Sequence, residues 1–259
     1  MSALRQATAP TAHAAGELRD VGLVTSPRAA ALWAGGSYAA LFLLAIFANF
    51  AVVERLVDPA DPGATLTALA GEASLVRAAV LAFGVVFVLD VVIAWALFVV
   101  LRPAGRDRAL LAAWSRLTYT AFLGVALVPL LLALQLSTED AYADLDPATR
   151  EAAVGLAVDS FDLLWLTGLA VFGLHLVVVG ALVVRSRTAP RLLGGLLVVA
   201  GVAYVLDTAA HVVLSDYERW AGLLLLVVAV PSVVGELWLT LWLLVRAGRD
   251  RGSSTGARP

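Results

Sequence analysis

The sequence of 259 residues has no cysteine, and all eighteen of its basic residues are arginine. The lack of cysteine excludes disulfide bonds, thiolate metal sites and cysteine nucleophiles. Charged residues make up only 15% of the chain, and the formal net charge is −2. Proteins that bind nucleic acid carry a basic patch or stripe, whereas the arginines here are mostly scattered among the loops. The composition therefore argues against a nucleic-acid partner and against thiol chemistry.

What the sequence has in excess is apolar residues, which make up 61% of the chain, against about 45–50% in a soluble domain. Six apolar segments are each long enough, at about 1.5 Å per helical residue, to cross a hydrocarbon core of about 30 Å. They are Ala31–Val53, Val76–Leu101, Leu110–Leu136, Phe161–Val184, Leu192–Leu214 and Trp220–Val245. The runs lack the strict alternation of a membrane strand. The sequence predicts an all-α polytopic integral membrane protein, a bundle of six transmembrane helices with short loops.

Arginines alternate along the loops and predict the orientation of the bundle. They occur in the N-terminal tail, in the second and fourth loops and after the last segment: Arg5, Arg19, Arg28, Arg102, Arg106, Arg108, Arg185, Arg187, Arg191, Arg246, Arg249 and Arg251. The other three loops, "ERLVDPADPG", "STEDAYADLDPATRE" and "SDYERW", are acidic. By the positive-inside rule, we expect both termini to be cytoplasmic in a multi-pass protein of the inner or plasma membrane.

The chain divides into a six-helix domain, residues 28–248, between two flexible cytoplasmic tails, residues 1–27 and 249–259. The first apolar run is too long for the core of a cleaved signal peptide, so we expect it to remain in the mature chain. In the longest loop, Asp146 before Pro147 is typical of a helix start. We expect a short outer-surface helix there.

Four stretches carry a resemblance to a known family: "AWSRL" at 113–117, "FGLHLVVVGALV" at 172–183, "APRLLGGLLVVAGVAYVLD" at 189–207 and "PSVVGELWLTLWLLVRAG" at 231–248. With the order of the helices, they resemble an uncharacterised bacterial membrane-protein family, domain of unknown function 4386. The resemblance extends over most of residues 28–248. It implies architecture and no chemistry.

Charged residues at mid-membrane depth cost about 2.5–3.5 kcal/mol each on insertion scales, so they normally face the bundle interior and pair or serve a site. Counting along the helices places Asp90, His175 and Glu236 at one level, about 14–16 Å from the cytoplasmic boundary. Arg116 begins nearer that boundary and can reach the same level. We expect these four residues to form one buried polar cluster.

A second polar group is expected near the outer boundary. It consists of Arg77, Asp159, Asp162, Asp207 and His211. Asp207 and His211 are four residues apart and therefore share a helix face. We expect this group to be wet and Arg77 to pair with Asp159, Asp162 or Asp207.

Each of these patterns has a purely structural alternative. Arg116 with Asp90 or Glu236 can be an ion pair that holds helices together, and His175 can be a hydrogen-bonded core histidine. Asp159 and Asp162 can be solvated residues at a helix start. Gly194 and Gly201, seven residues apart, favour close helix packing over hinges.

Three function classes stay open. The first is a transporter, small-molecule or proton-coupled, or a binding protein, built around the buried polar cluster. The second is an intramembrane metal-assisted enzyme that uses His175 with Asp90 or Glu236, although the spacing predicts no metal site. The third is a structural scaffold in the lipid bilayer. No motif indicates a particular cofactor, substrate or oligomeric state.

Overall fold

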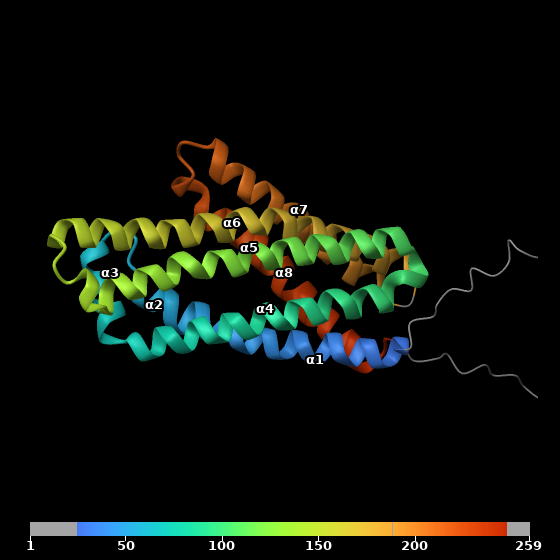
Figure 1. The fold of residues 1–259 in the computed structure, drawn as a ribbon. Helices are drawn as coiled ribbons and strands as arrows, with labels where there is room; N and C mark the ends of the chain where they lie inside the picture. The colour runs from blue at the N-terminus through green and yellow to red at the C-terminus, as the bar shows by residue number, and fades with distance from the viewer. Residues whose placement is uncertain (1–24, 188, 248–259) are drawn as a thin grey trace, which may run out of the picture.

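The computed structural model describes residues 25–187 and 189–247, and it is built from helices (Figure 1). Six of them are long and apolar enough to cross a membrane, which confirms the expected all-α, six-helix architecture. The elements are α1 (Pro27–Ala45), the π-helical η1 (Ile46–Val53), α2 (Glu54–Leu56), α3 (Pro62–Gly71), α4 (Ala73–Leu101), η2 (Arg102–Ala104), α5 (Arg106–Thr138), η3 (Asp140–Tyr142), α6 (Pro147–Ser186), α7 (Arg191–Val213) and α8 (Glu218–Val245). The expected tails fall almost wholly outside the described residues.

Three helices begin with the same device, a polar capping residue followed by proline. The side chains of Ser26, Asp61 and Asp146 accept hydrogen bonds from the backbone N–H three residues later, at the starts of α1, α3 and α6. The cap satisfies a free N–H of the first turn, and proline there lacks an N–H that would otherwise be free. The helix start expected at Asp146 is thus confirmed.

The prediction of a short outer-surface helix after Asp146 is wrong, because the helix that starts there is α6, which continues for 40 residues without a break. Between Pro147 and the apolar run at Phe161 the sequence has no second proline, so nothing ends the helix once the cap has started it. The short helix lies in another loop. It is α3, which packs against α5 and α6 and places Pro62 next to Gly155.

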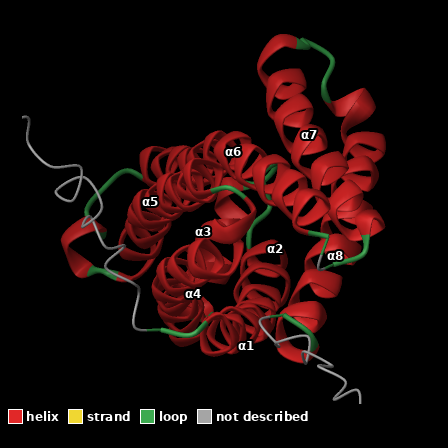
Figure 2. Ribbon diagram, turned by 90° about the vertical axis from the view of Figure 1, so that its right-hand side faces the viewer, coloured by secondary structure: helices red, strands yellow, loops and turns green. Residues whose placement is uncertain are grey.

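Neighbouring helices follow the chain around the bundle. α1 packs on α4, α4 on α5, α5 on α6, α6 on α7 and α7 on α8, and α8 returns to α1. α1 begins and α8 ends at one end of the bundle, which we call the termini end; the opposite end is the distal end. At the distal end the hairpin of α7 and α8 leans away from the other helices (Figures 1 and 2). The ring of helices is therefore closed at the termini end and opens distally.

Paired glycines bring α6 and α7 together. A Cβ atom on Gly180 would lie 2.5 Å from the backbone oxygen of Gly194, and one on Gly173 would lie 2.5 Å from the backbone oxygen of Gly201. Such a contact is far shorter than packed atoms tolerate, so this crossing requires residues without side chains. The close packing expected of Gly194 and Gly201 is confirmed.

The termini end is joined by Arg28 of α1. Its guanidinium donates to the backbone oxygens of Leu243 and Ala247, each at 3.0 Å, and to that of Leu244. The last carbonyls of a helix have no partner inside the helix, and a cation there also complements the helix dipole. Gly35 then lets Leu244 approach α1 closely. The first and last membrane helices are thereby held together at one end.

Candidate functional site

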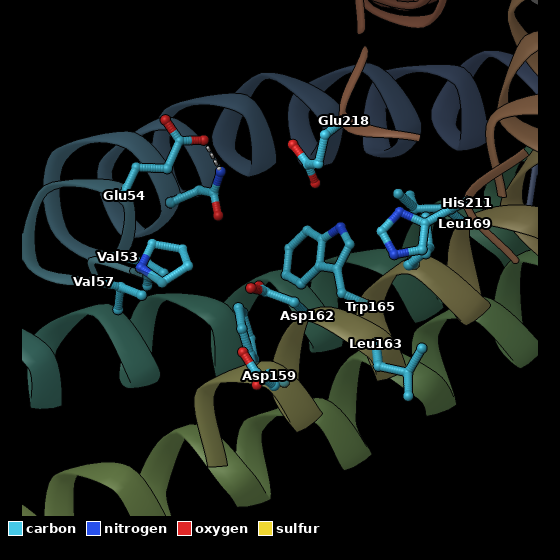
Figure 3. Close-up of a pocket in the computed structure, with 14 residues that line it drawn as sticks. Val53, Glu54, Val57, Asp159, Asp162, Leu163, Trp165, Leu169, His211 and Glu218 are labelled. Atoms are coloured by element: carbon cyan, nitrogen blue, oxygen red, sulfur yellow. Dashed lines mark hydrogen bonds between the residues drawn. The ribbon is translucent and has the colours of Figure 1, made fainter. Parts of the chain in front are cut away.

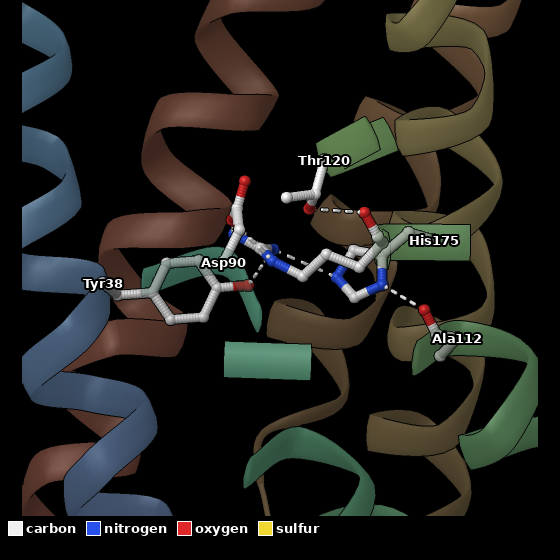
Figure 4. A network of polar contacts seen from close by, with 6 residues as sticks. Tyr38, Asp90, Ala112, Thr120 and His175 are labelled. Atoms are coloured by element: carbon white, nitrogen blue, oxygen red, sulfur yellow. Dashed lines mark hydrogen bonds and ion pairs between the residues drawn. The ribbon is translucent and has the colours of Figure 1, made fainter. Parts of the chain in front are cut away.

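Arg116 of α5 is the centre of a buried polar cluster, in which it contacts Tyr38 of α1, Asp90 of α4 and His175 of α6, three of the residues labelled around it in Figure 4. Arg116 as a whole residue is 1% exposed, as is Asp90. Arg116 Nε donates to Asp90 Oδ1 at 2.9 Å, Nη2 donates to the same oxygen, and Nη1 donates to the Tyr38 hydroxyl at 2.8 Å. The guanidinium carbon also lies 4.8 Å from the centre of the Tyr38 ring. An ion pair and an aromatic face therefore surround the buried cation.

His175 of α6 completes the contacts of Arg116. Its Nε2 lies 3.3 Å from Arg116 Nη1, and its Nδ1 lies 2.8 Å from the backbone oxygen of Ala112. A guanidinium can only donate and a carbonyl can only accept. His175 must therefore carry its proton on Nδ1 and accept at Nε2, which is the neutral form of the ring. Four of the five guanidinium N–H groups of Arg116 are then used.

Glu236 of α8 stands apart from these contacts. It is buried, but its Oε1 accepts from the Ser232 hydroxyl at 3.2 Å, and Ser232 in turn bonds to the Tyr204 hydroxyl of α7 at 3.0 Å. Among the described residues, the ion-pair partner of Arg116 is Asp90. The structure thus brings Asp90, Arg116 and His175 together and places Glu236 in a second hydrogen-bonded group between α7 and α8.

The residues of the expected outer group do not form one cluster. Arg77 is exposed on α4, and no ion pair joins it to another described residue, so its expected pairing is wrong. Arg77 lies close to the distal start of α4, and from there its long side chain can reach water. Asp207 accepts from the Tyr217 hydroxyl at 2.9 Å, and partial burial together with this contact raises the pKa of Tyr217 to about 12.

The other three members, Asp159, Asp162 and His211, line a distal cavity of about 860 Å³ (Figure 3). Pockets for small molecules typically measure about 300–1,000 Å³. This cavity lies at the distal end, where α8 diverges from α1. Its fourteen lining residues come from η1, α2, the following loop, α6, α7 and the start of α8. None of the four residues expected in the buried polar cluster lines it.

The distal cavity combines an acidic rim with an aromatic and apolar wall. Glu54 and Glu218 join Asp159 and Asp162 at the rim, and no arginine is among the lining residues. The indole of Trp165 forms part of the wall, held 5.6 Å from the ring of Phe161 and 5.4 Å from that of Phe83. Such an arrangement can hold a ligand by shape and apolar contact while attracting positive charge.

Sequence reasoning missed several residues of both sites. Tyr38 contributes a hydroxyl to Arg116, but one tyrosine in an apolar run carries no distinctive signal. Trp165 and Glu218 belong to the distal cavity, which depends on the departure of α8 from α1. For Glu54 a weak signal exists, because a second polar residue, Asn49, lies five residues earlier in the apolar run. In the structure Asn49 donates to Glu54 at 3.0 Å.

The described residues hold no group of three or more histidine, aspartate and glutamate side chains arranged to bind a metal ion. His175 has both ring nitrogens engaged, by Arg116 and by Ala112. A catalytic zinc site needs about three protein ligands that converge at about 2.0–2.2 Å from one point. The described residues therefore offer no set of metal ligands for the metal-assisted enzyme that the sequence left open.

Comparison with known proteins gives a family and no activity. An uncharacterized protein of the archaeon Archaeoglobus fulgidus is 26% identical over 161 residues, which cover 62% of this chain and 78% of that relative. No solved structure matches the chain. The expected bacterial origin stays a prediction. The sequence profile of the family named domain of unknown function 4386 matches residues 33–247, from the first turns of α1 to the end of α8. The chain belongs to this family.

Proposed function

We propose that this protein binds a small molecule in the distal cavity, as a membrane binding protein or transporter. The observation that carries this proposal is the cavity itself, which has the volume of a ligand pocket and is lined by residues from several helices. Its acidic residues lie beside an apolar wall, and Asp159, Asp162 and Glu218 accept no hydrogen bond from any described residue. These carboxylates remain available to a ligand.

We assign a structural role to the buried polar cluster, in place of the ligand-binding role that the sequence suggested. Arg116 hydrogen-bonds to both Asp90 and His175, and the three residues are almost completely buried. Of the polar side-chain atoms of these three residues, Asp90 Oδ2 alone is left without a hydrogen-bond partner among the described residues. A ligand at this site would have to displace these hydrogen bonds before it could form its own. The cluster is better suited to hold α1, α4, α5 and α6 in register.

We further propose that the chain is a multi-pass protein of the inner or plasma membrane with its termini end in the cytoplasm. The arginines of the second loop support this orientation, since Arg102, Arg106 and Arg108 follow or precede membrane helices at that end. A reporter enzyme that is active only outside the cytoplasm should be inactive when inserted at residue 104 and active at residue 60. Activity at residue 104 would overturn the orientation.

Ligand binding can be tested by native mass spectrometry of protein extracted in mild detergent. Leu166 lines the distal cavity, whereas Leu156 lies on the same helix, 69% exposed, and does not line it. A Leu166→Trp substitution should fill the cavity and remove a co-purifying small molecule that the wild type and the matched control Leu156→Trp retain. A wild type that carries no such molecule, or a Leu166→Trp protein that keeps it, would favour a structural scaffold instead.

A further inference from the structure

The ligand class of the distal cavity can be argued from its charge. Four carboxylates, those of Glu54, Asp159, Asp162 and Glu218, lie along the lining, and His211 is the single basic side chain there. Three of the carboxylates accept no hydrogen bond from the described residues, and Glu54 accepts one from the amide of Asn49. A cavity lined by one sign of charge and backed by apolar walls concentrates the field, and therefore attracts the opposite charge.

The aromatic wall favours an organic cation over a metal ion. Figure 3 shows Asp162, Trp165 and Glu218 pointing toward the same space. Indole is the best aromatic partner for a cation, and it suits quaternary ammonium and similar organic cations, which are weakly hydrated and carry apolar surface. A small metal ion would instead need three or more converging oxygen or nitrogen ligands, which the described residues do not offer here.

The walls toward the lipid indicate that this cation is amphiphilic. Leu163, Leu166 and Leu169 of α6 line the cavity, and the distal half of α8 beside it exposes Leu223 and Leu226. A molecule with an alkyl or aromatic body could keep that body in apolar surroundings while its charged group meets the carboxylates.

We propose, resting on the function assigned above, that the ligand of the distal cavity is an amphiphilic organic cation. Asp162 and Glu218 bind its charged group and Trp165 contacts its face. A neutral or anionic molecule of the same shape is disfavoured, because it would leave these carboxylates without a counter-charge. Tetraphenylphosphonium and tetraphenylborate test this idea, since they have nearly the same shape and opposite charge.

Binding of each ion should be measured by equilibrium dialysis with the full chain in nanodiscs of zwitterionic lipid, after subtraction of the uptake by empty nanodiscs. We expect saturable binding of tetraphenylphosphonium, at least tenfold tighter than that of tetraphenylborate. The substitutions Asp162→Asn and Glu218→Gln should each weaken it about tenfold, the effect of about 1.4 kcal/mol of lost attraction. Asp140→Asn, in the distal loop outside the cavity, is the matched control and should leave binding unchanged.

The other outcomes separate the two proposals. Equal binding of both ions that Leu166→Trp abolishes would overturn the cation assignment and leave the binding function standing. Cation binding that is the same in Asp162→Asn, Glu218→Gln and wild type would also overturn the assignment. If neither ion binds and no small molecule co-purifies, the proposed function fails, and the cation assignment fails with it.

Discussion

Arg116 and Asp162 lie on helices that pack side by side, and both are charged residues within membrane-spanning helices, yet their surroundings differ. Arg116 is 1% exposed and uses four of its N–H groups on Asp90, Tyr38 and His175. Asp162 is exposed at the wall of the distal cavity and accepts no hydrogen bond from the described residues. A charge whose hydrogen bonds are already made stabilises the bundle, whereas a charge left open to a cavity is available to a ligand.

α8 shows the same contrast along a single helix. At the termini end its last carbonyls accept hydrogen bonds from Arg28, and Leu244 packs against Gly35. At the distal end its start borders the cavity through Glu218, and Leu225 and Leu226 are exposed. Tight packing and an open cavity therefore occur at opposite ends of one helix pair.

The largest expected loss of stability comes from breaking the buried ion pair of Arg116 and Asp90. Asp90→Ala or Arg116→Ala leaves a buried charge without its partner, which costs about 3–5 kcal/mol. We expect either variant to lose that much in the free energy of unfolding, measured by thermal or denaturant unfolding in mild detergent. The double variant Arg116→Met with Asp90→Leu should lose less than either single one, and Arg77→Ala, on the exposed face of α4, should change little. A loss below about 1 kcal/mol in Asp90→Ala would contradict the structural role.

Two adjacent glycines of α7 offer a sharper comparison. A Cβ atom on Gly194 would lie 2.6 Å from the backbone oxygen of Gly180, whereas one on Gly195 would have nothing within 4 Å. Gly194→Ala should therefore push α7 from α6 and destabilise the protein by about 1–3 kcal/mol. Gly195→Ala should be neutral or slightly stabilising, because alanine favours the helix. Equal unfolding midpoints for the two variants would disprove the close crossing.

Glu236→Ala tests whether this glutamate belongs to the cluster of Arg116. The substitution removes one hydrogen bond, from Ser232, and no ion pair. We therefore expect the free energy of unfolding to fall by about 1 kcal/mol. Asp90→Ala, measured in the same unfolding assay, should cost clearly more. If the two variants lose the same stability, Glu236 and Asp90 share the stabilisation of Arg116 equally, and the separation between the two groups does not hold.

The smallest expected effect on stability is that of Asp162→Asn. Its side chain is exposed and makes no hydrogen bond to the described residues, and surface substitutions of this kind usually change stability by less than about 0.5 kcal/mol. The variant should unfold at the wild-type midpoint. An unfolding midpoint lowered as far as that of Asp90→Ala would show that the distal carboxylates support the fold, and would remove the contrast with Arg116.

The fold could be predicted from the sequence wherever a local pattern decides it. Apolar length gives the six long helices, the pair Asp146 and Pro147 starts α6, and the spacing of Gly194 and Gly201 indicates a close crossing. α3 was not predicted, although Asp61 and Pro62 give its start the same cap as that of α6, because its ten residues are too short a run to stand out and gain their packing from α5 and α6. The π-helical turns of η1 have no recognised pattern either.

The two sites were predictable to different degrees. Counting residues along helices places Asp90, His175 and Glu236 at one depth, with Arg116 within reach of it, because helical rise is constant, and charges at that depth normally pair. Counting cannot show which side chain faces which, so the contact of Tyr38 with Arg116 and the hydrogen bond between Glu236 and Ser232 were not predicted. The distal cavity arises from the lean of the α7–α8 hairpin, a tertiary feature with no counterpart in the local sequence around Trp165.

The clasp of Arg28 on the end of α8 has a consequence for biosynthesis. Its donors and acceptors are separated by 215 to 219 residues, which a ribosome adds in about 10–40 s. For that time α1 is in the membrane without its final neighbour, and the guanidinium of Arg28 has only water or lipid headgroups to contact. α8 must find α1 after α8 itself has entered the membrane, so the helix ring closes late, and a chain that stops before Leu243 would leave α1 open to other proteins in the membrane.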